Sequence, residues 1–167
     1  MSISSSPLVS SFVILCLVPS ASYSQQTIFL VRHADRDLTV PDALKSEGYT
    51  RASDLAATLK DAGITVVIRS DTIRTKDTAL PIVRSRGIPE KIIKADDDHV
   101  KKSYEAIRAA GANARVLYVG HSNTIPPLLS KLGCQPEVTI GEREYGDMFI
   151  VVPKEPNPML IKLHFGK

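Results

Sequence analysis

The sequence predicts a single α/β domain with a doubly wound, mostly parallel β-sheet and helices on both faces. Three observations support this fold class. Short runs of β-branched and apolar residues end abruptly in polar residues, the stretches between them have helical character, and a glycine follows each of these stretches. Strands that alternate with helices in this way are typical of α/β layer structures. A chain of 167 residues, 43% hydrophobic and 23% charged, is long enough for one hydrophobic core.

Three compact apolar runs are predicted to be buried parallel strands, because a strand covered on both faces has a continuous apolar sequence. They are residues 27–31, 66–68 and 116–119. Two later runs, residues 148–152 and 160–165, flank a proline-rich turn. We expect these two runs to form a hairpin at the edge of the sheet.

The predicted helices lie between the strands, at residues 49–62, 75–85 and 100–110. Glycine is the residue type most often found just past the end of a helix. The glycines at these three ends are Gly63, Gly87 and Gly111.

The first 24 residues differ in composition from the rest of the chain. They contain none of the 21 basic and 18 acidic residues. Within them, residues 12–18 form an apolar run that is too short to span a bilayer and is followed by Pro19 and small residues up to Ser24. This order is typical of a secretory signal peptide, so we expect residues 25–167 to be an exported domain, periplasmic or secreted. The alternative is a loosely packed N-terminal tail.

The net charge, the number of cysteines and the spacing of the histidines argue against several classes of partner and ligand. The net charge of +3 is small and the basic residues are dispersed, which argues against a nucleic-acid or membrane-surface protein. Signal cleavage leaves Cys134 as the single cysteine, which we expect to be structural and unbridged. The sequence has no His-x-x-x-His and no cysteine pair. We therefore predict no metal and no cofactor.

Polar residues at three predicted strand ends predict a binding site, because ligands of open α/β sheets bind at the carboxyl ends of the strands. Arg32 and His33 follow the first strand, Arg74 comes shortly after the second, and His121 follows the strand that ends at residue 119. Taken alone, an Arg-His pair after a strand is usually a surface turn, an arginine one turn into a helix is usually solvated, and Gly-His-Ser is a common loop sequence. Their occurrence together at one sheet edge indicates a site.

The residue types at these strand ends suit phosphoryl chemistry. Arg32 and Arg74 can each present a planar fork of donors to phosphoryl oxygens. A neutral His33 can attack phosphorus while a cationic His121 adds positive charge beside the equatorial oxygens. Hydrolysis would then proceed in two steps, formation and hydrolysis of a phosphohistidine.

Four segments resemble the motifs of the histidine phosphatase superfamily, which includes the cofactor-dependent phosphoglycerate mutases. They are residues 30–35 (LVRHAD), 43–52 (ALKSEGYTRA), 70–79 (SDTIRTKDTA) and 120–123 (GHSN), in the order of the family. The resemblance implies that His33 is the phosphorylated nucleophile and that Arg32, Arg74 and His121 form the phosphate pocket. The chain looks most like small, exported bacterial members.

The resemblance leaves the general acid open, because Ser122 and Asn123 follow the second histidine where phytase-like members carry an acid. Mutase-like members have a glutamate after the third strand, and this chain has a run of three aspartates, residues 96–98. We expect Asp97 to be the acid, with Asp35 as a second candidate. From residues alone, the same run is interpreted as an N-terminal cluster of the following helix.

Three further residues carry weaker expectations. Arg69 is expected to add a charge near the mouth of the site or to point to solvent. His99 is expected to begin a helix and His164 to be an ordinary strand residue, neither with a part in the site.

The resulting hypothesis is a phosphomonoesterase that acts on a small phosphorylated substrate such as a sugar phosphate. Only 46 residues separate Arg74 from His121, which leaves no room for a large lid and argues against mutase activity. Two alternatives remain: a phosphatase of protein phosphohistidine, and a non-catalytic phosphate-binding protein of the same fold. The sequence does not predict an oligomeric state.

Overall fold

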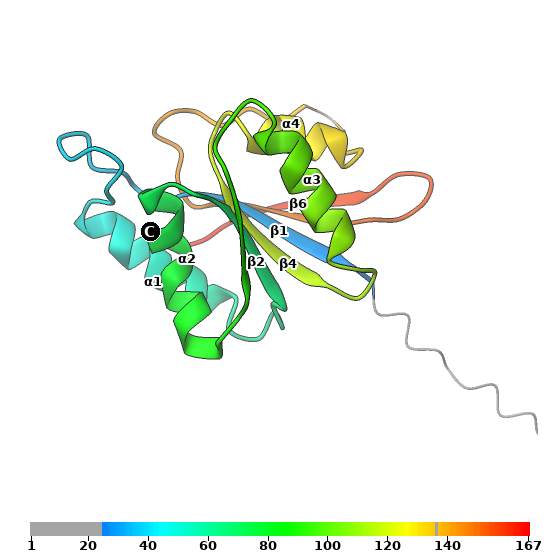
Figure 1. Cartoon of the computed structure of the whole chain (residues 1–167), viewed down its shortest axis with the longest axis horizontal. Helices are drawn as coiled ribbons and strands as arrows, with labels where there is room; N and C mark the ends of the chain where they lie inside the picture. The colour runs from blue at the N-terminus through cyan, green and yellow to red at the C-terminus, as the bar shows by residue number, and fades with distance from the viewer. Residues whose placement is uncertain (1–24, 136) are drawn as a thin grey trace, which may run out of the picture.

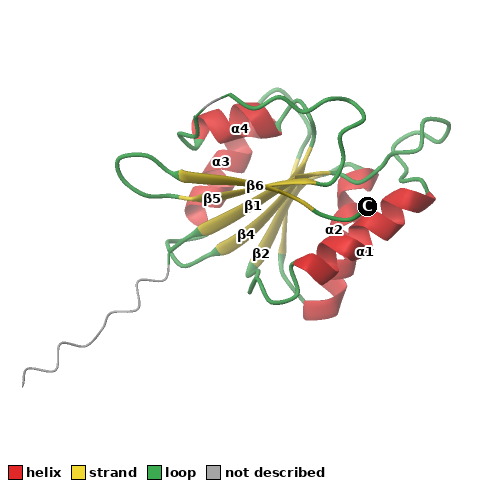
Figure 2. Cartoon of the chain, turned by 180° about the vertical axis from the view of Figure 1, so that it is seen from behind, coloured by secondary structure: helices red, strands yellow, loops and turns green. Residues whose placement is uncertain are grey.

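A central sheet between two pairs of helices organises the chain, as the computed structural model shows (Figures 1 and 2). The structure describes residues 25–135 and 137–167, so the predicted signal peptide, residues 1–24, lies outside the described residues. None of the helices in the described part of the chain is long and apolar enough to cross a membrane.

The sheet has six strands in the order β3-β2-β4-β1-β5-β6. The first four in this order are parallel, and β5 and β6 run antiparallel to their neighbours. This arrangement confirms the predicted mostly parallel sheet and the hairpin at its edge. The strands are β1 (Thr27–Arg32), β2 (Val66–Ser70), β3 (Glu90–Ile93), β4 (Arg115–Gly120), β5 (Asp147–Val152) and β6 (Met159–His164).

The helices cover both faces of the sheet, as predicted (Figure 1). Side chains of β1 alternate between two apolar clusters, because successive residues of a strand point to opposite faces. Phe29 and Val31 pack on the side of α1 and α2, whereas Ile28 and Leu30 pack on the side of α3 and α4. The helices are α1 (Ser46–Thr58), α2 (Ile73–Arg86), α3 (His99–Ala109) and α4 (Ile125–Lys131).

Two elements, β3 and α4, are absent from the sequence prediction. In β3, only Ile93 is buried, because this short strand lies at the edge of the sheet and begins with two charged residues. In α4, Pro126 and Pro127 suggest a loop, but they occupy the first turn, where the backbone N–H groups have no partner within the helix.

Two glycines allow close approaches that position the site. A Cβ on Gly120 would lie 2.4 Å from the Tyr118 ring, so glycine at the end of β4 leaves room for the Tyr118 side chain beneath it. A Cβ on Gly48 would lie 2.3 Å from the carbonyl oxygen of Asp35. Glycine there lets the first turn of α1 contact the backbone just after His33.

Candidate active site

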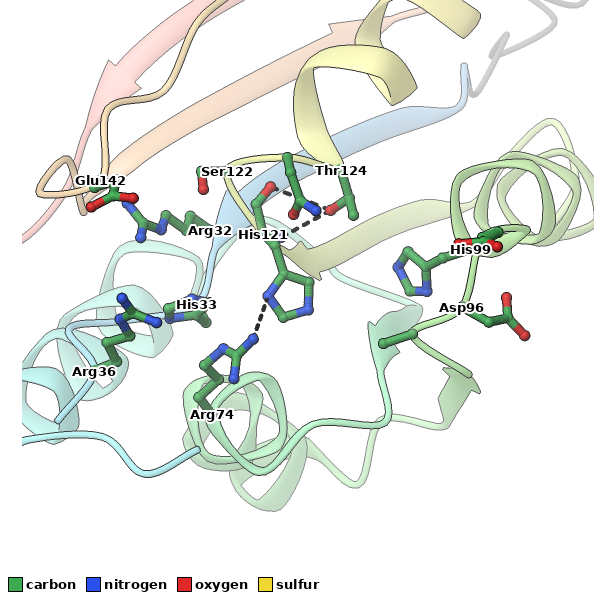
Figure 3. A pocket seen from close by; sticks show the side chains of 13 residues that line it. Arg32, His33, Arg36, Arg74, Asp96, His99, His121, Ser122, Thr124 and Glu142 are labelled. Carbon is green, nitrogen blue, oxygen red and sulfur yellow. Dashed lines mark hydrogen bonds between the residues drawn. The ribbon is translucent and has the colours of Figure 1, made fainter. Parts of the chain in front are cut away.

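The four side chains predicted at the strand ends line one cavity of about 430 Å³ at the carboxyl edge of the sheet (Figure 3). Arg32 and His33 come from the end of β1, Arg74 from the first turn of α2, and His121 from the residue after β4. Asp97 lines the same cavity. The structure thus brings together all five predicted site residues.

His33 is held in one tautomer by its own backbone. Its Nδ1 lies 2.8 Å from the carbonyl oxygen of Ala34. A carbonyl can only accept, so Nδ1 donates the proton and Nε2 keeps the lone pair. Burial lowers the pKa of His33 to about 3, and the neighbouring Arg74, His121 and Arg32 act in the same direction, against the bond to Ala34. His33 is therefore a neutral imidazole with a free nucleophilic nitrogen.

Arg32 is fixed by the loop before β5. Its Nη1 donates to the carbonyl oxygens of Gly141 and Glu144, at 2.8 and 3.1 Å, and the guanidinium lies over the Tyr145 ring at 4.3 Å. Its Nε is buried and has no hydrogen-bond partner among the described residues. Nε and Nη2 lie on the same edge of the planar group, so this edge of Arg32 carries donors without a partner in the described chain.

Arg74 is held in the same manner by different groups. Its Nη1 donates to Oδ1 of Asp42 at 2.5 Å, and its Nη2 lies 3.3 Å from Nδ1 of His121. Its Nε is also buried and unpartnered within the described chain. Two arginines beside His33 therefore have buried donors that a tetrahedral oxyanion can satisfy.

The contacts and the lowered pKa of His121 make the ring neutral, whereas from the sequence we expected a cationic ring. Nδ1 accepts from Arg74, because a guanidinium can only donate, and Nε2 therefore donates to Oγ of Ser70 at 2.9 Å. Burial, Arg74 and His99 lower the pKa of His121 to about 4, and Asp42 acts in the opposite direction. A phosphate dianion would favour protonation of this ring by attraction.

His99 lines the cavity, although from the sequence we expected it to have no part in the site. It is the first residue of α3, as expected, but its side chain is buried. Nδ1 donates to the carbonyl oxygen of Lys94 at 2.9 Å, and Nε2 lies 3.0 Å from the Tyr118 hydroxyl. Tyr118 in turn contacts Thr124, whose hydroxyl accepts from the backbone N–H of His121. The sequence carries no signal for this chain of contacts.

The three aspartates at residues 96–98 differ in their contacts. The carboxylates of Asp96 and Asp98 lie 2.9 and 3.8 Å from Nζ of Lys102. Asp98 stands at the N-cap of α3, but its side chain makes no capping hydrogen bond. Asp97 is exposed at the cavity wall. Its role as the acid stays a prediction.

Two other candidates lie outside the cavity. Asp35, the second candidate for the acid, accepts from Nε of Arg51 at 2.6 Å and lines a different hollow. Arg69 neither reaches the mouth of the site nor points to solvent. It is buried and its Nε donates to Glu90 at 2.6 Å, which ties β2 to β3.

No group of three or more His, Cys, Asp or Glu residues in the described ranges is arranged to hold a metal ion. The geometry defines an α/β domain with a histidine- and arginine-lined pocket at the carboxyl edge of its sheet. The family model of the histidine phosphatase superfamily, branch 1, matches residues 28–98, which run from β1 to the loop before α3. No curated protein matches the sequence significantly.

Solved structures share this fold at low sequence identity. A mycobacterial glucosyl-3-phosphoglycerate phosphatase in complex with VO3 has a TM-score of 0.61 and 15% identity over 80% of this chain and 96% of its own. A candidate phosphohistidine phosphatase, SixA, of Nakamurella multipartitia has a TM-score of 0.62 and 22% identity, with coverages of 85% and 97%. The phosphoglycerate mutase of Plasmodium falciparum has a TM-score of 0.57 and 20% identity, with coverages of 86% and 91%.

The family-model match over residues 28–98 and the shared fold confirm the predicted resemblance to the histidine phosphatase superfamily. Because both phosphatases and a mutase share the fold, the fold alone does not select the reaction.

The two neutral histidines make stability depend on pH. In the unfolded chain a histidine has a pKa of about 6.5, whereas the pKa values of His33 and His121 are lowered to about 3 and about 4 in the folded protein. Between these values and pH 6.5 the unfolded state binds more protons, so stability is full above pH 6.5 and is lost as the pH falls.

We expect the free energy of unfolding in urea to decrease from pH 7 to pH 5, with about 1–2 kcal/mol of that decrease arising from each histidine. His33→Asn and His121→Asn should each remove one such contribution. A variant with the same pH dependence as the wild type would contradict the assignment for that histidine.

Proposed function

We propose that the protein is a phosphomonoesterase that transfers a phosphoryl group from a small phosphorylated substrate, such as a sugar phosphate, to His33 and then to water. One observation carries this proposal. The nucleophilic Nε2 of a neutral His33 lies beside two arginines, Arg32 and Arg74, whose buried Nε donors have no partner in the described chain. A phosphoryl group supplies the oxygens that these donors lack and the phosphorus that Nε2 can attack.

In the first step, Nε2 of His33 forms a bond to phosphorus while the bond from phosphorus to the ester oxygen breaks. Negative charge is spread over the three equatorial oxygens, where the donor edges of Arg32 and Arg74 stabilise it. The Nδ1 bond to Ala34 becomes stronger as the ring acquires positive charge. In the second step, water attacks phosphorus, inorganic phosphate leaves, and Nε2 regains its lone pair.

The leaving oxygen needs a proton unless its alcohol is acidic. In-line displacement places this oxygen on the side of phosphorus opposite His33. The loop between β3 and α3, which carries Asp96, and His99 at the start of α3 border the cavity on the side away from His33 (Figure 3). Asp97 belongs to this loop, is exposed at the cavity wall and has no ion pair with Lys102, unlike the aspartates on either side. Asp97 is therefore the best placed of the three to donate the proton.

Hydrolysis is favoured over phosphoryl transfer back to the leaving group. A mutase must retain its intermediate and exclude water while the substrate reorients. Here the segment between β3 and α3 spans only five residues, and Asp97 within it is exposed. Water can therefore reach the phosphohistidine.

Changing the nucleophile tests the proposal directly. Wild-type protein should hydrolyse p-nitrophenyl phosphate, and His33→Ala should lower kcat by more than about a hundredfold, because the covalent route is lost. Radiolabelled substrate should leave an acid-labile, alkali-stable label on the wild type alone. A wild type that shows neither label nor turnover would support the non-catalytic alternative. Turnover of phosphohistidine peptides without turnover of sugar phosphates would support a phosphatase of protein phosphohistidine.

Leaving-group chemistry tests the acid. Asp97→Asn should slow an alkyl phosphate by roughly 10²- to 10⁴-fold and leave p-nitrophenyl phosphate nearly unchanged, because the aryl leaving group needs no proton. Asp96→Asn and Asp98→Asn are matched controls, since both carboxylates are paired with Lys102. If Asp97→Asn affects both substrates equally, Asp97 is not the acid.

We also infer that residues 1–24 direct export of the domain, on the basis of their lack of charge and their short apolar run. Expression of the full chain in a bacterium should yield an exported protein that begins at Gln25 by intact-mass measurement. An uncleaved chain retained in the cytoplasm would contradict export.

A further inference from the structure

Asp42 makes an unusual pair of contacts behind Arg74. Its backbone has a φ of +62°, the left-handed region that few residues other than glycine, asparagine and aspartate adopt. Its Oδ1 accepts from Nη1 of Arg74 at 2.5 Å, and its Oδ2 accepts from the backbone N–H of Ile73 at 2.6 Å. One carboxylate therefore binds both the first residue of α2 and the side chain of the second.

The loop that carries Asp42 is itself fixed at both ends. Arg36 and Leu44 form an isolated antiparallel bridge, and the backbone N–H of Asp37 donates to the carbonyl oxygen of Ala43 at 2.9 Å. Thr72, the N-cap of α2, makes no side-chain capping bond, so Asp42 supplies this contact instead. The position of the carboxylate is thus set by the loop and by the helix together.

The contact determines which edge of the guanidinium faces the cavity. Asp42 occupies Nη1 and Nη2 lies 3.3 Å from Nδ1 of His121, so Nε is the donor that remains without a partner in the described chain and is available to a phosphoryl oxygen. Arg32 is held at the same atom, Nη1, by two backbone carbonyls. Arg74 has no such carbonyls among its described contacts. Without Asp42, the longer contact of Nη2 with His121, at 3.3 Å, would be its remaining restraint, and the substrate would have to order more of this flexible side chain.

We propose that Asp42 is a positioning residue, which orients Arg74 for the transition state. The proposal rests on the phosphomonoesterase function inferred above. Asp42 acts through Arg74 and contacts no reacting atom.

Two opposing effects give the proposal a distinctive kinetic signature. Removal of the Asp42 charge leaves Arg74 more attractive to any anion, whereas loss of its orientation weakens interactions that require exact geometry. In ground-state binding the two effects offset each other. In the transition state the geometry dominates, because misplacement of a catalytic group by about 1 Å can cost about a hundredfold.

The test uses Asp42→Asn, because asparagine tolerates the left-handed backbone but cannot accept from both Ile73 and Arg74 with a charged oxygen. With p-nitrophenyl phosphate, kcat should fall roughly 10- to 100-fold while KM changes less than about threefold. Affinity for vanadate, which mimics pentacoordinate phosphorus, should fall in parallel with kcat, whereas affinity for inorganic phosphate should change little. Asp37→Asn, in the same loop, is the matched control with unchanged kinetics, because among the described residues the Asp37 carboxylate accepts only from Thr39 and Val40.

A double-mutant comparison separates positioning from a structural role. In an Arg74→Ala background, Asp42→Asn should cause less than a twofold further loss of kcat/KM and of vanadate affinity, because the residue it orients is absent. If Asp42→Asn folds poorly, Asp42→Gly takes its place in the test, because glycine accepts the positive φ without strain. Asp42→Gly should then show the kinetic changes expected of Asp42→Asn.

Several outcomes would overturn the proposal. Unchanged kcat in a folded Asp42 variant would show that Arg74 needs no such partner, and an equal loss with and without Arg74 would show that Asp42 acts elsewhere. If wild-type protein binds vanadate but does not turn over substrate, the phosphatase function fails while the vanadate comparison still decides the role of Asp42. If the wild type neither binds vanadate nor turns over substrate, both proposals fail.

Discussion

The parallel register of β1 and β4 is the constraint on which the site depends. It places Arg32 opposite Gly120, and the next backbone N–H, that of His33, donates to the carbonyl oxygen of Gly120 at 2.9 Å. The residues that follow the two strands are therefore neighbours, and the ring centroids of His33 and His121 lie 5.4 Å apart. A shift of one residue would turn one ring to the other face of the sheet, because side chains alternate along a strand. Glycine at position 120 is required as well, since a side chain there would collide with Tyr118.

The register of β2 extends this arrangement to the second wall of the cavity. Arg69 pairs with Val119, so Ser70 lies beside the end of β4 and its hydroxyl contacts His121 at 2.9 Å. Helix α2 begins only three residues later and presents Arg74 from its first turn. Burial and the positive charges of Arg74 and Arg32 lower the pKa of both imidazoles, and such surroundings favour neutral rings until an anion binds.

The parts of this structure that sequence could predict are those encoded by local patterns. The buried strands at residues 27–31, 66–68 and 116–119 have continuous apolar runs, and their positions at one sheet edge follow from the layer rules of α/β folds. Arg32, His33, Arg74 and His121 could be selected because each directly follows a strand or opens the next helix. By contrast, β3 carries charged residues at the sheet edge, and α4 begins with two prolines, so neither has the usual pattern of its element.

The residues that sequence reasoning missed are those whose roles depend on contacts between distant segments. His99 lines the cavity because its ring contacts the hydroxyl of Tyr118 in β4, a residue 19 positions away in the sequence. The tautomer of His121 depends on its contacts with Arg74 and with the buried Ser70, and neither contact has a sequence signal.

Asp42 illustrates the same principle most clearly. It lies 32 residues before Arg74, in a loop with no regular secondary structure, and it has a backbone conformation that its residue type tolerates but does not require. Motifs at strand ends thus identify the groups that would contact a phosphoryl group. The groups that orient them come from loops that the fold brings behind the motifs, as Asp42 does for Arg74 and the carbonyls of Gly141 and Glu144 do for Arg32. Because both arginines are restrained at Nη1, their unpartnered Nε donors can be ordered before substrate arrives, which reduces the entropy that binding must otherwise cost.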